Sequence, residues 1–214
     1  MAVSQIVFLR HGQTANNLER RIQGSRDTPL NDEGRRQASE IAPEIAQLGI
    51  TRIYSSDLSR ARDTAAAVAE VTGLEITVDA RLRERAYGVW EGLNSDEIRQ
   101  AWPTEWKRWR EGLEPGAPGI QTRLENGELM AAAVSDAIAA VNELADAGKT
   151  TVNEKLLFVS HGSAIANAIN VLLGQDPSVW NGLQGLDNCH WAVLAPRLNS
   201  NPAWRIVSYN RWFA

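Results

Sequence analysis

Two of the three histidines in the chain stand in nearly identical surroundings. Residues 6–12 and 157–162 each contain a hydrophobic run, one polar residue and then His-Gly, so that His11 and His161 follow predicted strands. The carboxyl ends of parallel strands meet at one edge of a sheet, where open α/β sheets place their ligand sites. Either histidine alone is more often a structural residue at a strand end, but the pairing of the two favours a shared functional site.

A metal site and a phosphate site are the two chemistries to compare. Arg10 adjoins His11 and would repel a cation, and the sequence has no His-Glu-x-x-His motif or Cys/His cluster. An anion fits better, and Arg62 supports it. Arg62 falls on the predicted inward stripe of a helix after Asp57, where a buried arginine needs a negative partner. That partner is either a bound phosphate or an acidic side chain of the protein itself.

Other routes to phosphate chemistry are excluded by their missing motifs. The chain has no Walker-type phosphate loop, no Gly-x-Gly-x-x-Gly after a strand and no Gly-x-Ser-x-Gly elbow. Cys189 is followed six residues later by Ala195 rather than by the arginine of a cysteine phosphatase. A histidine nucleophile, which can form a covalent phosphoryl intermediate, remains.

Strands and helices alternate along most of the chain. The pattern predicts strands at 5–9, 52–54, 75–78, 156–160, 190–194 and 205–207, and helices at about 31–48, 58–73, 129–147 and 164–173. Residues Ser55, Ser56 and Asp57 are the expected N-cap of the second helix, and Pro43 is expected to kink the first helix or to mark its first turn. Such alternation predicts an α/β fold, a three-layer α/β/α sandwich around a mostly parallel sheet.

Residues 93–127 interrupt this alternation with prolines, glycines and three tryptophans, Trp102, Trp106 and Trp109, at helical spacing. We expect this segment to be an insertion over the edge of the sheet, either a lid or a small core packed by the tryptophans. The whole chain, residues 1–214, is then a single domain that carries this insertion.

The composition is that of a globular protein, with 43% hydrophobic and 22% charged residues. No apolar run approaches the roughly 20 residues of a membrane helix. The net charge of −4 gives no general attraction to nucleic acid or membrane. A single cysteine, Cys189, excludes an internal disulfide framework, so the expected location is the reducing cytoplasm.

Several spaced motifs resemble the signature of the histidine phosphatase (phosphoglycerate mutase-like) superfamily, in particular its smaller phosphatases. They extend from about residue 8 to residue 162 and lie in the same order as in that family. The matching segments are residues 9–14 with Asn17, 23–24, 27–30, 34, 55–65, 81–84, 88, 90–92 and 160–162.

The resemblance implies a role for each matched residue. His11 is the nucleophile that becomes phosphohistidine, and Glu84 is the acid that protonates the leaving group. The other implied site residues share the task of holding the substrate: Arg10, Arg62 and His161 form the phosphate pocket, Asn17 adds a donor, and Gln23, Gly24 and Tyr87 touch the substrate. Phosphoryl transfer mainly needs such positioning and charge stabilisation, so the resemblance to the phosphatases implies that this chain needs neither a metal nor another cofactor.

The sequence favours a phosphatase over a cofactor-dependent mutase. The insertion lacks the paired arginines followed by prolines that the glycolytic mutases carry, and residues 209–214 do not resemble the mutase tail. The expected substrate is a small phosphomonoester, such as phosphoglycerate or its glycosylated form. A mutase and a catalytically silent binding protein are the alternatives, and the assembly is expected to be a monomer or homodimer.

Two further regions bear on specificity. Residues 119–122 read Gly-Ile-Gln-Thr where the smaller phosphatases commonly have Gly-Gly-Glu-Ser. The substrate specificity of those phosphatases therefore cannot be transferred directly to this chain. The three tryptophans of the insertion are expected to stack on a sugar or another apolar face, and Lys107, Arg108 or Arg110 to meet a carboxylate. Near the site edge, Asn188 is expected to make a contact, whereas Cys189 and His190 are interpreted as structural. Glu91 is a rival to Glu84, and only the resemblance decides between them.

Overall fold

The computed structural model describes residues 2–150, 153–180 and 182–212. A six-stranded sheet in the order β3-β2-β4-β1-β5-β6 lies at its centre. β1, β2, β3 and β4 run parallel, and β5 is antiparallel to both β1 and β6. The strands are β1 (Val3–Arg10), β2 (Arg52–Ser55), β3 (Ile76–Val78), β4 (Glu154–Ser160), β5 (Trp191–Pro196) and β6 (Trp204–Arg211).

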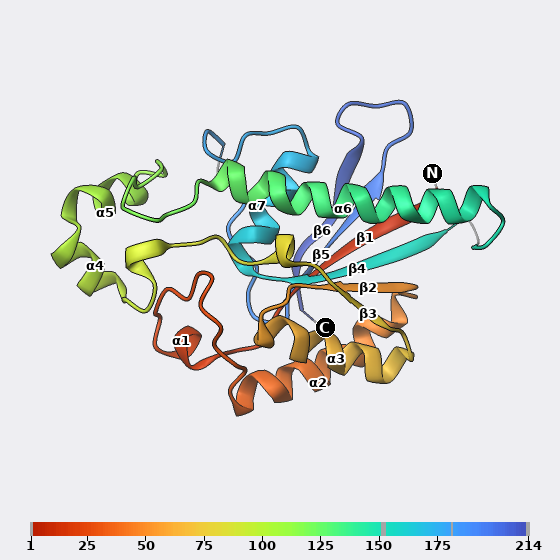
Figure 1. Ribbon diagram of the computed structural model, residues 1–214, viewed down its shortest axis with the longest axis horizontal. Helices are drawn as coiled ribbons and strands as arrows, with labels where there is room; N and C mark the ends of the chain where they lie inside the picture. The colour runs from red at the N-terminus through yellow and green to blue at the C-terminus, as the bar shows by residue number, and fades with distance from the viewer. Residues whose placement is uncertain (1, 151–152, 181, 213–214) are drawn as a thin grey trace.

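Helices cover both faces of this sheet (Figure 1). The helices are α1 (Ala15–Leu18), α2 (Asp32–Gln47), α3 (Ser59–Thr72), α4 (Ser95–Ala101), α5 (Pro103–Arg110), α6 (Arg123–Asp146) and α7 (Gly162–Leu172), with short 3-10 turns η1 (Ala80–Leu82) and η2 (Gly88–Trp90). The predicted three-layer α/β/α sandwich with a mostly parallel sheet is therefore confirmed.

The period-two pattern of the central strands explains the two cores. In β1, Ile6 and Phe8 face one side and pack with α6 and α7, whereas Val7 and Leu9 face the other side and pack with α2 and α3. All four side chains are fully buried. A strand buried on both faces reads as a continuous apolar run, as residues 6–9 do.

Several boundaries differ from the predicted ones. α3 begins at Ser59 with Leu58 as its N-cap and no side-chain cap, so the predicted capping by residues 55–57 is wrong. α6 begins six residues earlier than predicted because Thr122 and Glu125 form a capping box. Pro43 lies inside α2 rather than in its first turn.

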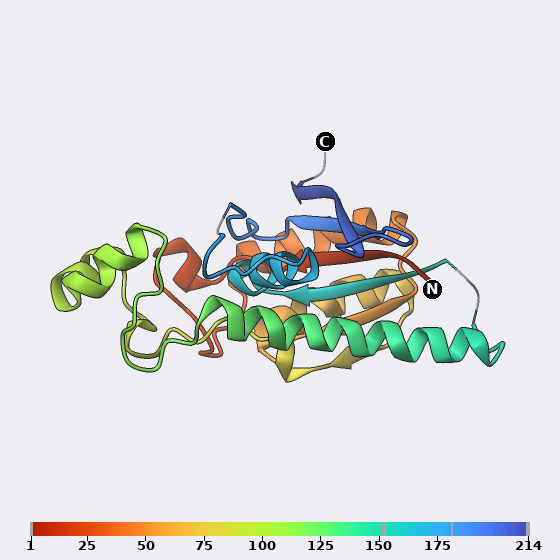
Figure 2. The same cartoon turned by 90° about the horizontal axis from the view of Figure 1, so that it is seen from above.

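The predicted insertion contributes α4 and α5, which project from one end of the molecule (Figures 1 and 2). The carboxyl ends of β1 and β4 point toward that same end. α4 and α5 are packed by a third apolar cluster around the buried Trp90, which includes Trp102, Trp106 and Trp109. The tryptophans therefore form the small core that was one of the two expectations for this segment.

Within the described ranges, none of the helices is both long and apolar enough to span a membrane.

Candidate active site

A pocket of about 200 Å³ opens where β1 ends. Its lining brings together segments that are far apart in sequence. The lining residues are Arg10, His11, Asn17, Arg21, Ile22, Gln23, Gly24, Arg60, Glu84, Tyr87 and Trp109. Seven of the predicted site residues thus meet in one cavity, namely Arg10, His11, Asn17, Gln23, Gly24, Glu84 and Tyr87.

His11 lies at the floor of this pocket, with 2% of its surface exposed. Its Nδ1 lies 2.6 Å from the carbonyl oxygen of Gly12, an acceptor that requires Nδ1 to carry the proton. The proton on Nδ1 leaves Nε2 with a free lone pair, as a nucleophile requires. Burial first, and then the positive charges of Arg10 and Arg60, lowers the pKa of His11 well below its ordinary value. The imidazole is therefore neutral and able to attack.

Arg10 provides a donor that the protein leaves without a partner. Its Nη1 donates to the carbonyl of Leu186 at 2.5 Å. Its Nε is buried and, among the described residues, has no hydrogen-bond partner. A buried donor without a partner is costly. Arg10 also lines the pocket, so its positive charge can attract an anion there.

The second pocket arginine is Arg60, and the prediction of Arg62 is wrong on this point. Arg62 is exposed on α3, whereas Arg60 is fully buried and lines the pocket. The buried stripe of α3 consists of residues 60, 61, 64, 65 and 68 rather than the predicted stripe through 58, 62, 65, 69 and 72. Because the helix is rich in alanine, apolar residues alone did not define its inward face.

Arg60 is fixed from three sides. Its Nη1 and Nη2 donate to the carbonyls of Arg26 at 2.7 Å and of Gly24 at 2.9 Å. Its Nε donates to Nδ1 of His161 at 3.2 Å. These bonds hold the guanidinium at the pocket while its charge remains without an ion pair closer than 4.0 Å in the described part of the chain.

His161 lies behind the pocket wall rather than in it. Its ring centroid is 5.1 Å from that of His11, and both of its nitrogens are engaged. Nδ1 accepts from Arg60, so Nε2 carries the proton and donates to Ser56 Oγ at 3.0 Å. Burial, followed by the charge of Arg60, lowers the pKa of His161 well below its ordinary value. In this arrangement His161 orients Arg60, and its direct contact with phosphate stays a prediction.

Asn17 is held so that its amide nitrogen is available. Its Oδ1 accepts from the Thr14 backbone N–H, the Thr14 hydroxyl and Asn188 Nδ2, each at 3.1 Å. With its oxygen occupied, Asn17 can offer Nδ2 to a ligand. Asn188 also donates to the carbonyl of His11 at 3.0 Å, which gives this residue the contact expected from its position.

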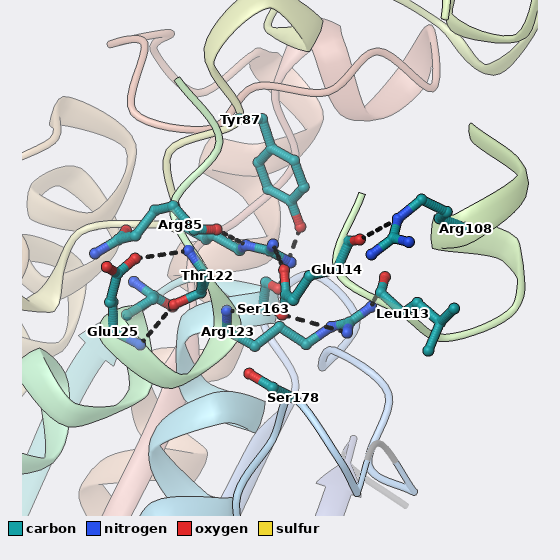
Figure 3. Close-up of polar contacts among 12 residues, drawn as sticks. Arg85, Tyr87, Arg108, Leu113, Glu114, Thr122, Arg123, Glu125, Ser163 and Ser178 are labelled. Carbon is teal, nitrogen blue, oxygen red and sulfur yellow. Dashed lines mark hydrogen bonds and ion pairs between the residues drawn. The ribbon is translucent and has the colours of Figure 1, made fainter. Parts of the chain in front are cut away.

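Glu84 lies at the N-terminus of α7. Its carboxylate accepts from the backbone N–H groups of Ser163 at 3.1 Å and Ala164 at 2.9 Å, and from that of Arg85 at 2.8 Å. These bonds fix the carboxyl group, and Glu84 lines the pocket that also contains His11. Close by, the hydroxyl of Tyr87 lies 3.3 Å from that of Ser163 (Figure 3).

Glu91, the rival acid, has a structural position instead. Its Oε1 accepts from the backbone N–H groups of Ser25 at 2.9 Å and Tyr87 at 3.0 Å, and from the Ser25 hydroxyl. A Cβ at Gly24 would lie 2.2 Å from this oxygen, so the loop fits only glycine there. Glu91 ties the loop of Gly24 to the segment of Tyr87 and does not line the pocket.

The outer part of the pocket contains residues that the sequence motifs did not identify. Arg21 and Ile22 line it, and Trp109 is the tryptophan of the insertion that reaches it. Trp109 packs against Trp90 and Trp106, with ring centroids 5.5 and 5.2 Å apart. Position in sequence did not separate Trp109 from the other tryptophans, because all three are spaced along one helical face.

The cations of α5 do not line this pocket, contrary to expectation. Arg108 donates to the backbone carbonyl of Glu114, and Arg110 lies over the ring of Trp106. The structural interpretation of Cys189 agrees with its surroundings, since burial raises the pKa of its thiol to about 12. His190 stacks on Trp212 with ring centroids 5.0 Å apart.

No group of three or more His, Cys, Asp or Glu side chains suited to a metal ion occurs in residues 2–150, 153–180 and 182–212. The cavity is lined by one histidine, two arginines and a carboxyl group, with His161 behind its wall, and this set is suited to phosphoryl transfer.

Comparison with known proteins identifies the same family. The model of the histidine phosphatase superfamily (branch 1) matches residues 6–211. Glucosyl-3-phosphoglycerate phosphatase of Mycolicibacterium vanbaalenii is 34% identical over 98% of this chain and 96% of its own length. A probable phosphoglycerate mutase of Escherichia coli is 38% identical over 79% of this chain and 75% of its own length.

Comparison with solved structures points to the same family. Mycobacterial glucosyl-3-phosphoglycerate phosphatase in complex with inorganic phosphate superimposes with a TM-score of 0.85 at 34% identity, over 98% of each chain. Phosphoserine phosphatase of Entamoeba histolytica in complex with 3-phosphoglyceric acid gives a TM-score of 0.73 at 27% identity, over 98% of each chain. With its strand-end histidines, its pocket arginines and a family match along nearly its whole length, the chain belongs to the histidine phosphatase superfamily.

Proposed function

We propose that the chain is a metal-independent phosphatase that hydrolyses a small phosphomonoester through a phosphohistidine on His11. One observation carries the proposal. Nδ1 of His11 is held as N–H by the carbonyl of Gly12, so the free Nε2 faces a pocket that also contains Arg10 and Arg60. The neutral nucleophile and the positive charges that an anionic phosphate requires are thus in place together.

In the first step, Nε2 of His11 attacks phosphorus and the bond between phosphorus and the ester oxygen breaks. Arg10, Arg60 and Asn17 stabilise the charge on the equatorial oxygens. Glu84 gives its proton to the departing oxygen, which leaves as an alcohol. His161 contributes through its hydrogen bond from Arg60.

In the second step, Glu84 takes a proton from water, and the water oxygen attacks the phosphorus of phosphohistidine. The P–N bond breaks, its electron pair returns to Nε2, and inorganic phosphate is released. Glu84 and His11 recover their starting forms. The acid of the first step thus becomes the base of the second.

The outer pocket supports an ester whose alcohol is polar, with or without a sugar ring. Tyr87 and Trp109 present aromatic surface, and Gln23 contributes an amide. Arg21 adds a guanidinium, although Glu19 and Glu97 already pair with it. Phosphoglycerate or glycosylated phosphoglycerate is the substrate class that we propose, in line with the glucosyl-3-phosphoglycerate phosphatase among the relatives.

A phosphoglycerate mutase is the second candidate, because one group of relatives carries that name as a probable activity. A mutase must shield phosphohistidine from water and return its phosphoryl group to a second acceptor. A catalytically silent binding protein of the same fold is the third possibility, and it would bind phosphate esters without turning them over.

One experiment separates the three. Inorganic phosphate release is measured from a panel of small phosphomonoesters in EDTA, for the wild type and for His11→Ala. We expect release by the wild type that is lost in the variant, with phosphoglycerates or their glycosylated forms preferred. Phosphoryl exchange between phosphoglycerates without phosphate release would favour the mutase, and inactivity toward the whole panel would favour the binding protein.

A further inference from the structure

The segment that carries Glu84 has little regular structure of its own. Residues 83–87 connect η1 to η2, and only Tyr87 takes part in an isolated bridge, with Ile120. The backbone N–H groups of Ser163 and Ala164 hold the carboxyl group on one side. On the other side, its position depends on what the neighbouring side chains of its own segment contact. Arg85 is the neighbour that matters most, because its side chain is only 1% exposed.

Arg85 contacts the catalytic acid with its backbone and the lid segment with its side chain. Its backbone N–H donates to Glu84 Oε1 at 2.8 Å. Its Nε donates to the carbonyl of Gln121 at 2.5 Å, and its Nη2 to the carboxylate of Glu114. A shift of the Arg85 side chain would therefore move the backbone beside the carboxyl group of Glu84.

Glu114 is the only carboxylate that pairs with Arg85 in the described part of the chain, and it also serves Arg123 (Figure 3). The backbone N–H of Arg123 donates to Glu114 Oε1 at 3.0 Å, and its Nη1 lies 3.4 Å from the same oxygen. Arg123 begins α6 and also donates to the carbonyl of Gly112 at 2.8 Å. The carboxylate of Glu114 thus fixes the end of the insertion at the start of α6. It also neutralises one of the two neighbouring guanidinium charges, those of Arg85 and Arg123.

The buried position of Arg85 makes that carboxylate necessary. A buried guanidinium without a negative partner is strongly destabilised and moves toward water. With Glu114 neutral, Arg85 and Arg123 would also repel each other across the space that the carboxylate now occupies. Glu114 itself does not line the pocket, so it has no direct route to the substrate phosphate.

We propose that Glu114 is a positioning residue for Glu84 and acts through Arg85, an inference that rests on the acid role proposed for Glu84. The loop of residues 119–122, in which this chain departs from the smaller phosphatases, supplies the second anchor of Arg85 through the Gln121 carbonyl. The insertion, residues 93–127, therefore holds the catalytic acid in place and also borders the pocket.

Leaving-group dependence tests the proposal, since an alkyl alcohol needs protonation to depart whereas 4-nitrophenolate does not. kcat and KM are measured with 3-phosphoglycerate and with 4-nitrophenyl phosphate for Glu84→Gln, Glu114→Gln and Glu114→Asp. Glu111→Gln is the matched control, because Glu111 is an exposed residue just after α5 that pairs with Lys107 at 4.0 Å. Thermal unfolding followed by circular dichroism accompanies each variant.

Glu84→Gln is expected to lose about 10²-fold or more in kcat with 3-phosphoglycerate and much less with the nitrophenyl ester. Glu114→Gln should lose about tenfold with 3-phosphoglycerate and less than about twofold with the nitrophenyl ester, at a nearly constant KM. Glu114→Asp keeps the charge, so it should lose less activity than Glu114→Gln but again more with 3-phosphoglycerate than with the nitrophenyl ester. It provides the test of the positioning role if Glu114→Gln does not fold. Glu111→Gln should match the wild type.

Equal losses of Glu114→Gln on both esters, or no loss on either, would overturn the positioning role while leaving Glu84 as the acid. A Glu84→Gln variant without leaving-group selectivity would instead overturn the role proposed for Glu84.

Discussion

The two ends of the pocket are built in different ways. At the phosphate end, His11 and Arg60 are buried and held by backbone carbonyls of Gly12, Gly24 and Arg26. At the leaving-group end, Arg21, Tyr87 and Trp109 come from three separate segments. Apolar packing holds Trp109, whereas Arg21 is paired with two carboxylates and donates to one backbone carbonyl, that of Gly92.

This difference places the residues that carry out the reaction and the residues that select the substrate in different parts of the pocket. A group held by backbone carbonyls keeps its place when surface side chains change, so the reaction can persist while the substrate changes. Trp109, the part of this wall that comes from the insertion, can be altered without disturbing the strand ends. We therefore expect substitutions at the phosphate end to abolish turnover, and substitutions at the leaving-group end to change substrate preference.

The largest effect that distinguishes the two ends is expected at Arg60. Arg60→Ala removes a buried guanidinium that stabilises charge at phosphorus, so kcat/KM should fall about 10²–10³-fold for every ester. Arg62→Ala, two residues away on the exposed face of α3, is the control and should stay within about twofold of the wild type. Steady-state phosphate release measures both, and a reversed order of the two variants would contradict the assignment.

The pH dependence of stability tests the burial of the phosphate end. The pKa values of His11 and His161 are both well below 6.5 in the folded chain, whereas the unfolded chain binds these protons near 6.5. Below that pH the unfolded state therefore holds more protons. The free energy of unfolding should fall as the pH is lowered, by up to about 1.4 kcal/mol per pH unit for each histidine, until the folded-state pKa is reached.

Urea unfolding between about pH 7 and pH 5 measures this slope. His11→Asn should reduce it by up to about half. An unchanged slope in His11→Asn would show that the imidazole does not enter the folded protein as the neutral form.

The smallest effect is expected at the leaving-group end. Trp109→Leu removes the aromatic wall, and stacking of this kind contributes about 0.5–1.5 kcal/mol. KM for a glycosylated phosphoglycerate should rise about three- to tenfold, with KM for 4-nitrophenyl phosphate much less affected. Trp102→Leu, in the same lid cluster but not in the pocket lining, is the control. Equal changes in the two variants would assign Trp109 to packing alone.

The same contrast explains what could be predicted from the sequence. The strand-end histidines could be placed together because apolar runs define strands, and parallel strands bring their carboxyl ends to one edge. Gln23, Gly24 and Asn17 could be assigned from motif resemblance. The reaction class thus came from short, local patterns.

Two features of the site could not be predicted from local sequence patterns. The choice between Arg60 and Arg62 depends on the rotation of α3, and alanines on several faces of that helix give too weak an apolar pattern to define it. The selection of Trp109, Arg21 and the Glu114–Arg85 pair depends on how the insertion packs against the rest of the chain. That packing is set by contacts between residues distant in sequence, which periodicity does not reveal.

The most direct test of the account is to identify the phosphorylated residue. The protein is mixed with a ³²P-labelled phosphoglycerate, quenched in alkali within one turnover, digested and analysed by mass spectrometry and radiography. We predict an alkali-stable, acid-labile phosphohistidine on the peptide that contains His11, linked through Nε2, and its loss in His11→Ala. Label on His161, or turnover without any labelled histidine, would contradict the account.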